Sequence, residues 1–306
     1  MGARRNPVGA HVPVAGGLAR SALRYADTVG AECVQVFVSN PRGWAASPGR
    51  PDQDEAFRRG ATARRLRAFV HAPYLVNLGS PTEATVRQSV DTLWHTVERA
   101  AAIGAEAVVF HAGSAVGPDR YVTALTAMGR LLRPLLDAGG PRLLVEPTAG
   151  GGRALAATVA DLGPFFDAVD GHPALGVCLD TCHLWAAGHD LSRRGGTAAM
   201  LDEFLAIVGP GRLGLVHAND SRDGLGTRRD RHANIGAGQI GAAAFRALFT
   251  HRATSGVPLV VETPDPDHTG AVHAADIASL TGLRGRTPGA SVRVPTAVRR
   301  TAAAAR

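Results

Sequence analysis

The chain contains no lysine, so all 33 of its basic residues are arginines. It has only three cysteines, which fit a reducing compartment better than a disulfide scaffold. No apolar run approaches the roughly 20 residues needed to cross a bilayer, and residues 1–7 lack the apolar segment of a signal peptide. These absences argue against membrane and secreted proteins, and we expect a cytoplasmic location.

The arginines leave a net charge of +7 on a chain of 306 residues. Coding bias in a GC-rich genome explains such a composition without any function. The charge nevertheless attracts polyanions, and the guanidinium group matches the geometry of phosphate. Composition therefore favours an anionic partner without identifying it.

Short apolar runs recur along the chain, and segments with helical periodicity lie between many of them. The runs occupy residues 9–14, 33–38, 67–71, 107–111, 142–146, 175–180, 213–217 and 258–262. The intervening helical segments include residues 85–103, 120–137, 154–169 and 240–250. Strands and helices in alternation are typical of a parallel sheet, and eight such units predict an α/β fold, a single-domain (β/α)8 TIM barrel.

The two ends of the chain differ from this pattern. We expect a short extension at residues 1–7, a barrel domain at 8–283 and a basic tail at 284–306. The tail has six arginines, two prolines and no apolar periodicity, so we predict that it is disordered. An inert tail and a segment with non-specific affinity for nucleic acid are both consistent with this composition.

The last six apolar runs each end in a residue that can bind a metal ion. These residues are His71, His111, Glu146, Asp180, His217 and Glu262. With 26 acidic residues and 12 histidines among 306, such a series is not expected by chance. Barrels place active sites at the carboxyl ends of their strands, so the six side chains should meet at one mouth. Imidazole and carboxylate ligands suit zinc, and manganese or iron less strongly.

Three further ligand-type residues lie close by in the sequence. His183 follows Asp180 by three residues, and Asp230 and His232 lie in the loop after the seventh run. Residues two apart in an extended segment project to the same side, so Asp230 and His232 can bind one ion. Cys178 and Cys182 also have metal-type spacing, but Cys178 lies inside an apolar run, where packing explains it better.

Six short motifs contain or flank these residues: GAHV at 9–12, HAPYLVNLG at 71–79, HAGS at 111–114, GVCLDTCH at 176–183, HAN at 217–219 and DRH at 230–232. Together they resemble signatures of the endonuclease IV family, the trinuclear-zinc apurinic/apyrimidinic endonucleases of DNA repair. The resemblance covers about residues 8 to 282, and every position where the family has a zinc ligand holds a compatible residue.

The resemblance implies about three zinc ions per chain, with manganese as an alternative at one site. The ligand sets would be His71, His111 and Glu146; Glu146, Asp180, His217 and Glu262; and His183, Asp230 and His232. Three divalent ions outweigh four carboxylates, so the mouth would attract phosphate. Glu146, as the bridging ligand, and Glu262 are the expected catalytic residues.

The implied reaction is hydrolysis of the phosphodiester 5′ to an abasic site in double-stranded DNA, leaving a 3′-hydroxyl and a 5′-deoxyribose phosphate. Metal-activated hydroxide would be the nucleophile, and trimming of 3′ ends is a related activity of such a site. Arg42 and Tyr74 occupy positions from which the family inserts side chains into the duplex. Arg228, Arg229 and Arg231 are candidate phosphate contacts, although an ordinary solvated loop has the same composition. We expect a monomer with no membrane partner.

Two other functions are consistent with parts of the pattern. A TIM-barrel sugar isomerase or epimerase would need only Glu146, Asp180, His217 and Glu262 for its metal, which leaves the other five ligands unexplained. A catalytically silent DNA-binding protein would have no reason to keep all nine ligands.

Overall fold

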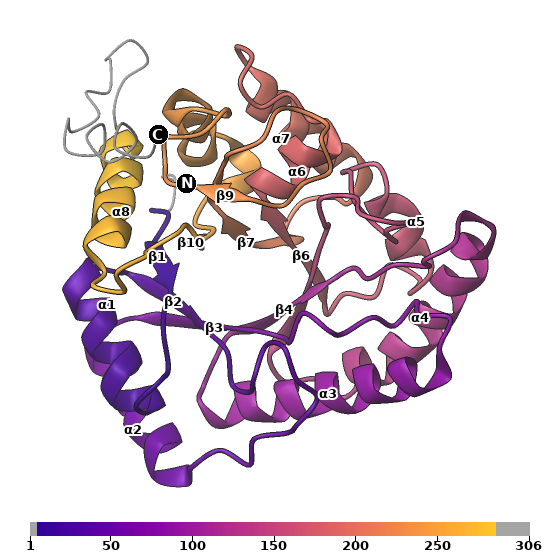
Figure 1. The fold of residues 1–306 in the computed structure, drawn as a ribbon, viewed down its shortest axis with the longest axis horizontal. Coiled ribbons are helices and arrows are strands. Elements are labelled where there is room, and N and C mark those ends of the chain that lie inside the picture. Colours follow the sequence, from indigo (N-terminus) through magenta and orange to yellow (C-terminus); the bar gives the residue numbers. More distant parts are fainter. Residues whose placement is uncertain (1–4, 286–306) are drawn as a thin grey trace, which may run out of the picture.

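Eight parallel strands form a closed barrel in the computed structural model, which describes residues 5–285 (Figure 1). Each strand pairs with its sequence neighbours, and β1 also pairs with β10, which closes the barrel. The barrel strands are β1 (Val8–His11), β2 (Cys33–Val36), β3 (Arg67–His71), β4 (Ala107–His111), β5 (Arg142–Glu146), β6 (Leu175–Asp180), β7 (Leu213–His217) and β10 (Leu259–Val261). The predicted (β/α)8 fold is thereby confirmed.

Helices surround the barrel on its outer side (Figure 1). They are α1 (Leu23–Val29), α2 (Pro51–Arg64), α3 (Glu83–Ala102), α4 (Tyr121–Asp137), α5 (Leu162–Asp167), α6 (Thr181–Ala187), α7 (Gly196–Ile207) and α8 (Ala271–Leu283). A 3-10 segment, η3 (Ala242–Phe249), takes the place of a helix before β10. None of the helices within residues 5–285 has the length and apolar character required to cross a membrane.

Two predicted helices differ from the structure. The predicted helix at 154–169 is reduced to α5, because residues 154–161 bind the loop after β4 instead: Ser114 bridges to Ala154, and Leu155 donates its N–H to the carbonyl of Gly113. The predicted α-helix at 240–250 is the 3-10 segment η3. In the first case tertiary contacts override the local helical periodicity.

A small apolar core fills the inside of the barrel, and a larger one packs between strands and helices. The inner core consists of Cys33, Phe69, Ala107, Val109, Leu144, Cys178, Leu215 and Val260. The Leu144 side chain fits because β6 and β7 carry glycine beside it. A Cβ atom would lie 2.7 Å from Leu144 Cδ2 at Gly176 and 2.6 Å from it at Gly214, which is too close. The apolar core inside the barrel thus supports the polar residues at its mouth.

The two ends of the described chain meet beside β1. The buried Asn6 side chain donates to the carbonyl oxygens of Thr254 and Val257. Arg284 donates to the carbonyl of Asn6 and, at 2.6 Å, to the carboxylate of Glu32. Arg284, the first residue of the predicted tail, is therefore bound to the barrel, and residues 286–306 lie outside the described part.

Candidate metal centre

A single layer of polar side chains lies directly above the inner core. Successive residues of a strand point to opposite faces, so the residue two positions after an inner-core residue also points inward. On seven strands, the residue two positions after the last apolar inner-core residue is polar. On β1, the same step of two leads from Gly9 to His11. The resulting layer is His11, Gln35, His71, His111, Glu146, Asp180, His217 and Glu262. Strand periodicity thus gathers six of the predicted ligands at one level.

The first predicted ligand set lies around one oxygen of Glu146. His71 Nε2 is 3.2 Å and His111 Nε2 is 3.7 Å from Glu146 Oε2. His71 Nδ1 donates to the carbonyl of Ala72 at 2.6 Å, which leaves Nε2 free to bind an ion. Two ligands about 2.0–2.2 Å from a zinc ion lie within about 4.4 Å of each other, so this set fits a divalent metal without rearrangement.

The second set surrounds His217 Nδ1. This atom lies 2.9 Å from Glu146 Oε1, 3.3 Å from Glu262 Oε2 and 3.9 Å from Asp180 Oδ2. All four side chains therefore present a ligand atom to one space, and Glu146 contributes one oxygen here and the other oxygen to the first set. The structure brings these residues together as the sequence predicted.

The third set joins α6 to the loop before β9 (His232–Ala233). His183 Nε2 lies 3.2 Å from Asp230 Oδ2, and His232 Nε2 lies 3.0 Å from Asp230 Oδ1. Asp180 Oδ2 is also 3.5 Å from His232 Nε2, so Asp180 lies between the second and third sets. This shared position of Asp180 was not part of the prediction.

The electrostatics of the mouth favour bound cations. Burial lowers the pKa of His111 to about 4, so its imidazole is neutral and can donate a lone pair. Burial opposes the charge on His232, but Asp180 and Asp230 outweigh it and raise the pKa of His232 to about 9. Burial also opposes ionisation of Glu146, yet His217 and His183 hold its pKa well below the usual range. The carboxylates thus require positive charge beside them, which divalent ions would provide.

Other side chains orient these ligands. Asn219 is buried; it donates from Nδ2 to Asp180 Oδ2 at 2.8 Å and accepts the backbone N–H of Glu262 at the same distance. His183 Nδ1 donates to the carbonyl of Pro147 at 3.0 Å, which turns Nε2 toward Asp230. Such partners fix ring orientation and tautomer at metal sites.

Sequence reasoning gave no role to His11, Gln35 or Asn219, although all three contact predicted ligands. The first two apolar runs extend to residues 14 and 38, beyond their inward polar residue, so only the last six runs end in a ligand. Counting in steps of two from Gly9 and Cys33 would have found His11 and Gln35. Asn219 follows the strand by two residues, and its role depends on a loop conformation that periodicity does not describe.

Two cysteines lie next to the ligand sets. Burial raises the pKa of both the Cys178 and the Cys182 thiol to about 12, and both are free thiols. Both lie within reach of predicted ligands, Cys178 beside Glu146 and His217, and Cys182 beside Asp230 and His232. Cys178 belongs to the inner core, as its position in an apolar run predicted.

The predicted DNA contacts lie on loops around the mouth. Tyr74 is 46% exposed and stacks on His111, with ring centroids 5.6 Å apart. Its N–H binds the carbonyl of Pro41 at 3.0 Å, which joins two loops beside the exposed Arg42. Both residues therefore lie close to the first ligand set, on the mouth side of the barrel.

The three arginines around Asp230 are not equivalent. All three are exposed, but the guanidinium of Arg231 binds both carboxylate oxygens of Asp223, one at 2.6 Å, and Arg229 Nη1 lies 3.9 Å from Asp223 Oδ1. Trp185 fixes the same loop, because its Nε1 donates to the carbonyl of Asp223 at 2.9 Å. Arg231 thus holds the loop.

A buried carboxylate holds the segment after β9. Asp220, in the short strand β8 (Asp220–Ser221), is fully buried and accepts hydrogen bonds from five backbone N–H groups. The donors are Ser221, Gly236, Gly238, Ile240 and Gly241. Because β8 pairs with β9, this carboxylate fixes the base of the hairpin that carries His232.

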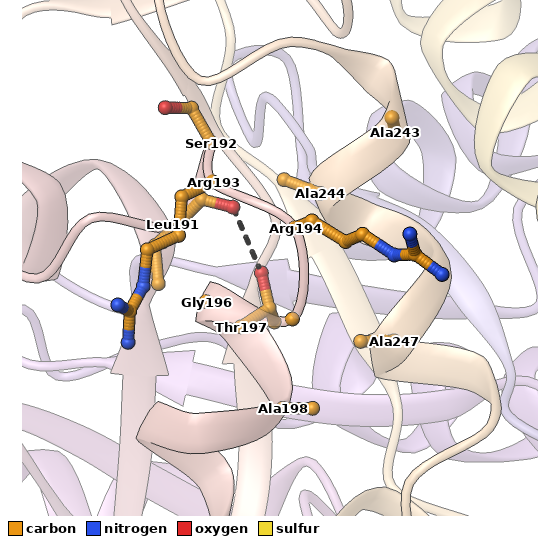
Figure 2. A pocket seen from close by; sticks show the side chains of 11 residues that line it. Leu191, Ser192, Arg193, Arg194, Gly196, Thr197, Ala198, Ala243, Ala244 and Ala247 are labelled. Atoms are coloured by element: carbon orange, nitrogen blue, oxygen red, sulfur yellow. Dashed lines mark hydrogen bonds between the residues drawn. The ribbon is translucent and has the colours of Figure 1, made fainter.

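A separate cavity of about 350 Å³ lies where α7 begins (Figure 2). Figure 2 shows Arg194 extended toward the segment that carries Ala244 and Ala247, and Thr197 bound to the carbonyl of Leu191. None of the nine predicted ligands lines this cavity, so it is distinct from the metal centre.

Comparison with known sequences gives consistent results. The profile described as "Xylose isomerase-like TIM barrel" matches residues 23–282. A probable endonuclease 4 of Streptomyces coelicolor is 55% identical over 92% of this chain and 96% of its own length. A probable endonuclease 4 of Chloroflexus aurantiacus is 34% identical over 92% of this chain and 98% of its own.

Comparison with solved structures gives the same result as comparison with sequences. The crystal structure of endonuclease IV from Thermus thermophilus matches with a TM-score of 0.77 and 35% identity, over 90% of this chain and 99% of that one. An L-ribulose 3-epimerase matches with a TM-score of 0.66 over 91% and 95%, but at 17% identity, which concerns the fold alone. Sequence likeness thus separates the two kinds of barrel.

Proposed function

The chain belongs to the endonuclease IV family, and from this we propose that it is a zinc-dependent apurinic/apyrimidinic endonuclease of DNA repair. It hydrolyses the phosphodiester 5′ to an abasic site and leaves a 3′-hydroxyl and a 5′-deoxyribose phosphate. The observation that carries this proposal is the arrangement of nine ligand side chains in three adjacent sets that share Glu146 and Asp180. We expect it to act as a monomer in the cytoplasm.

Each ligand set would hold one divalent ion, zinc in the first place, with manganese as an alternative at one position. The donor chemistry supports this assignment, because imidazole nitrogens and carboxylate oxygens are zinc ligands and the neutral His111 is ready to bind. Bound together, such ions lower the pKa of water, polarise a phosphoryl oxygen and stabilise the leaving oxygen of an in-line displacement. Glu146 would bridge two sets, and Glu262 would hold the second set and face the attacking group.

The protein side chains supply binding and orientation. Tyr74 stacks over His111 at the rim, so a ring is available where the base is missing from the duplex. Holding an abasic nucleotide out of the helix costs little, since no base has to be unstacked. Arg42, Arg228 and Arg229 are exposed around the mouth and would bind backbone phosphates.

A sugar epimerase is the weaker alternative. It shares the barrel and a set equivalent to Glu146, Asp180, His217 and Glu262, but needs neither the set at His71 and His111 nor the set at Asp230 and His232. The close contacts of these extra residues with Glu146 and Asp180 favour the nuclease.

The decisive experiment is incision of a defined abasic duplex by purified zinc-loaded protein, with the metal content measured by elemental analysis. We expect about three ions per chain and a product with an extendable 3′-hydroxyl. Glu146→Gln should reduce the rate by several orders of magnitude while binding to abasic DNA falls much less. Glu98→Gln, the same change at an exposed position of α3, is the control. An intact abasic duplex together with isomerisation of a free sugar would replace this proposal by the epimerase.

A further inference from the structure

Gln35 is the one side chain without an ionisable group in the inward-facing layer above the inner core. It lies on β2, is fully buried, and stands two residues after Cys33 of that core. Its amide nitrogen is 2.7 Å from Glu262 Oε1, and its amide oxygen is 3.0 Å from His217 Nε2. One side chain thus contacts two members of the second ligand set.

The orientation of the Gln35 amide follows from the chemistry of its neighbours. A carboxylate that binds a metal ion is ionised and only accepts hydrogen bonds, and Glu262 Oε1 lies 2.7 Å from the amide nitrogen of Gln35. The amide nitrogen must therefore face Glu262. The amide oxygen then faces His217 Nε2, which must carry a proton to donate to it.

This hydrogen bond selects the metal-binding nitrogen of His217. With the proton on Nε2, the lone pair of the neutral imidazole lies on Nδ1. Nδ1 is the atom 2.9 Å from Glu146 and 3.3 Å from Glu262, at the centre of the second set. The reversed amide would place two oxygens together at Glu262 and would leave Nε2 without its acceptor.

His11 completes the network on its other side. Its Nδ1 lies 2.8 Å from Glu262 Oε1, and its Nε2 is buried without a partner in the described chain. A buried N–H without an acceptor is costly, so the proton belongs on Nδ1, where it is donated to Glu262. Glu262 Oε1 thus receives two donors, and Oε2 remains directed toward His217 Nδ1 and the second set.

We propose that Gln35 is a positioning residue that fixes the tautomer of His217 and the orientation of Glu262 for metal binding. This inference rests on the proposed zinc site and adds a residue that acts on it without touching metal or DNA. Because partners of this kind change metal affinity about 10–100-fold, removing the amide should weaken one ion of the cluster selectively.

The test compares Gln35→Met with Gln53→Met, the same change on α2, away from the ligands. Zinc retention is measured during competition with a chelator, alongside wild-type metal content and abasic incision. We expect one ion of the Gln35→Met protein to dissociate about 10–100-fold more readily, with the others unchanged. Equal retention in both variants would overturn the role of Gln35; a wild type without zinc or incision would instead overturn the proposed function.

A second measurement needs no variant and is unaffected if Gln35→Met folds poorly. Nitrogen NMR of histidine-labelled, zinc-loaded wild-type protein reports which ring nitrogen of His217 carries hydrogen. We expect a protonated Nε2 whose hydrogen exchanges slowly with solvent, and a coordinated Nδ1. A coordinated Nε2, or rapid exchange at that position, would show that Gln35 does not set the tautomer.

Discussion

Replacing Asp220 by asparagine should destabilise the protein strongly, although the two side chains have nearly the same shape. Asp220 Oδ1 accepts the N–H groups of Ser221 at 2.8 Å and Ile240 at 2.9 Å. Oδ2 accepts those of Gly236 at 3.0 Å and Gly238 at 3.2 Å. Whichever way the new amide turns, its NH2 group faces two backbone donors. Each lost bond to a charged acceptor is worth about 1.5–3 kcal/mol, so the expected loss is about 3–6 kcal/mol.

The free energy of unfolding from urea titration measures this effect, with the slope of the transition checked for change. Asp267→Asn is the matched control, because the Asp267 side chain is exposed and accepts from Thr269 alone among the described hydrogen bonds. Since the hairpin carries His232, we also expect the Asp220→Asn protein to hold its third metal ion less tightly. A loss below about 1 kcal/mol, the worth of one ordinary hydrogen bond, would refute the reasoning.

Three shorter predictions follow from other parts of the molecule. His232→Ala should lose about one metal ion per chain by elemental analysis and keep a folded barrel by circular dichroism; loss of all ions would show that the three sets are not separable. Deleting residues 286–306 leaves Arg284 bound to Glu32. The slope of log K for DNA binding against log salt concentration should become less negative by about 0.9 for each phosphate that the segment neutralises. An unchanged slope would show that the segment does not touch DNA. Because burial lowers the pKa of His111 to about 4 and an unfolded histidine titrates near about 6.5, the unfolded chain binds this proton first. His111 should therefore make metal-free protein less stable as pH falls from about 6.5 to 4, and His111→Gln should show a shallower loss.

The strands could be predicted well because their pattern is unambiguous. Five of the eight predicted runs have the observed bounds, including β5 and β6, since buried parallel strands are apolar until the first inward polar residue. The ligands at those ends followed from the same pattern. The segment at 154–161 could not be predicted, because its alanines are compatible with a helix and its actual structure depends on contacts with residues 113–115.

The hydrogen-bond and ion-pair partners of individual side chains could not be predicted from the sequence either. The sequence makes Arg231 a reasonable phosphate contact, but its pairing with Asp223 depends on how the loop packs against Trp185 of α6. The placement of Asp180 beside His232 likewise depends on how close β9 lies to the end of β6. Contacts of this kind depend on the tertiary structure. Whether a residue points into the barrel depends only on its position along one strand.

The closing of the barrel has a consequence for how a newly made chain acquires its ions. His71, His111 and Glu146 lie on three consecutive strands, so this set is complete when residue 146 has left the ribosome. The second set needs Glu262, next to β10, and that strand pairs with both β7 and β1. Pairing between strands far apart in the sequence is slow, because the long connection between them has to be closed first. We therefore expect a nascent chain to bind an ion at His71, His111 and Glu146 before the second ligand set is complete. Pairing of β10 with β7 and β1 closes the barrel and completes that second set.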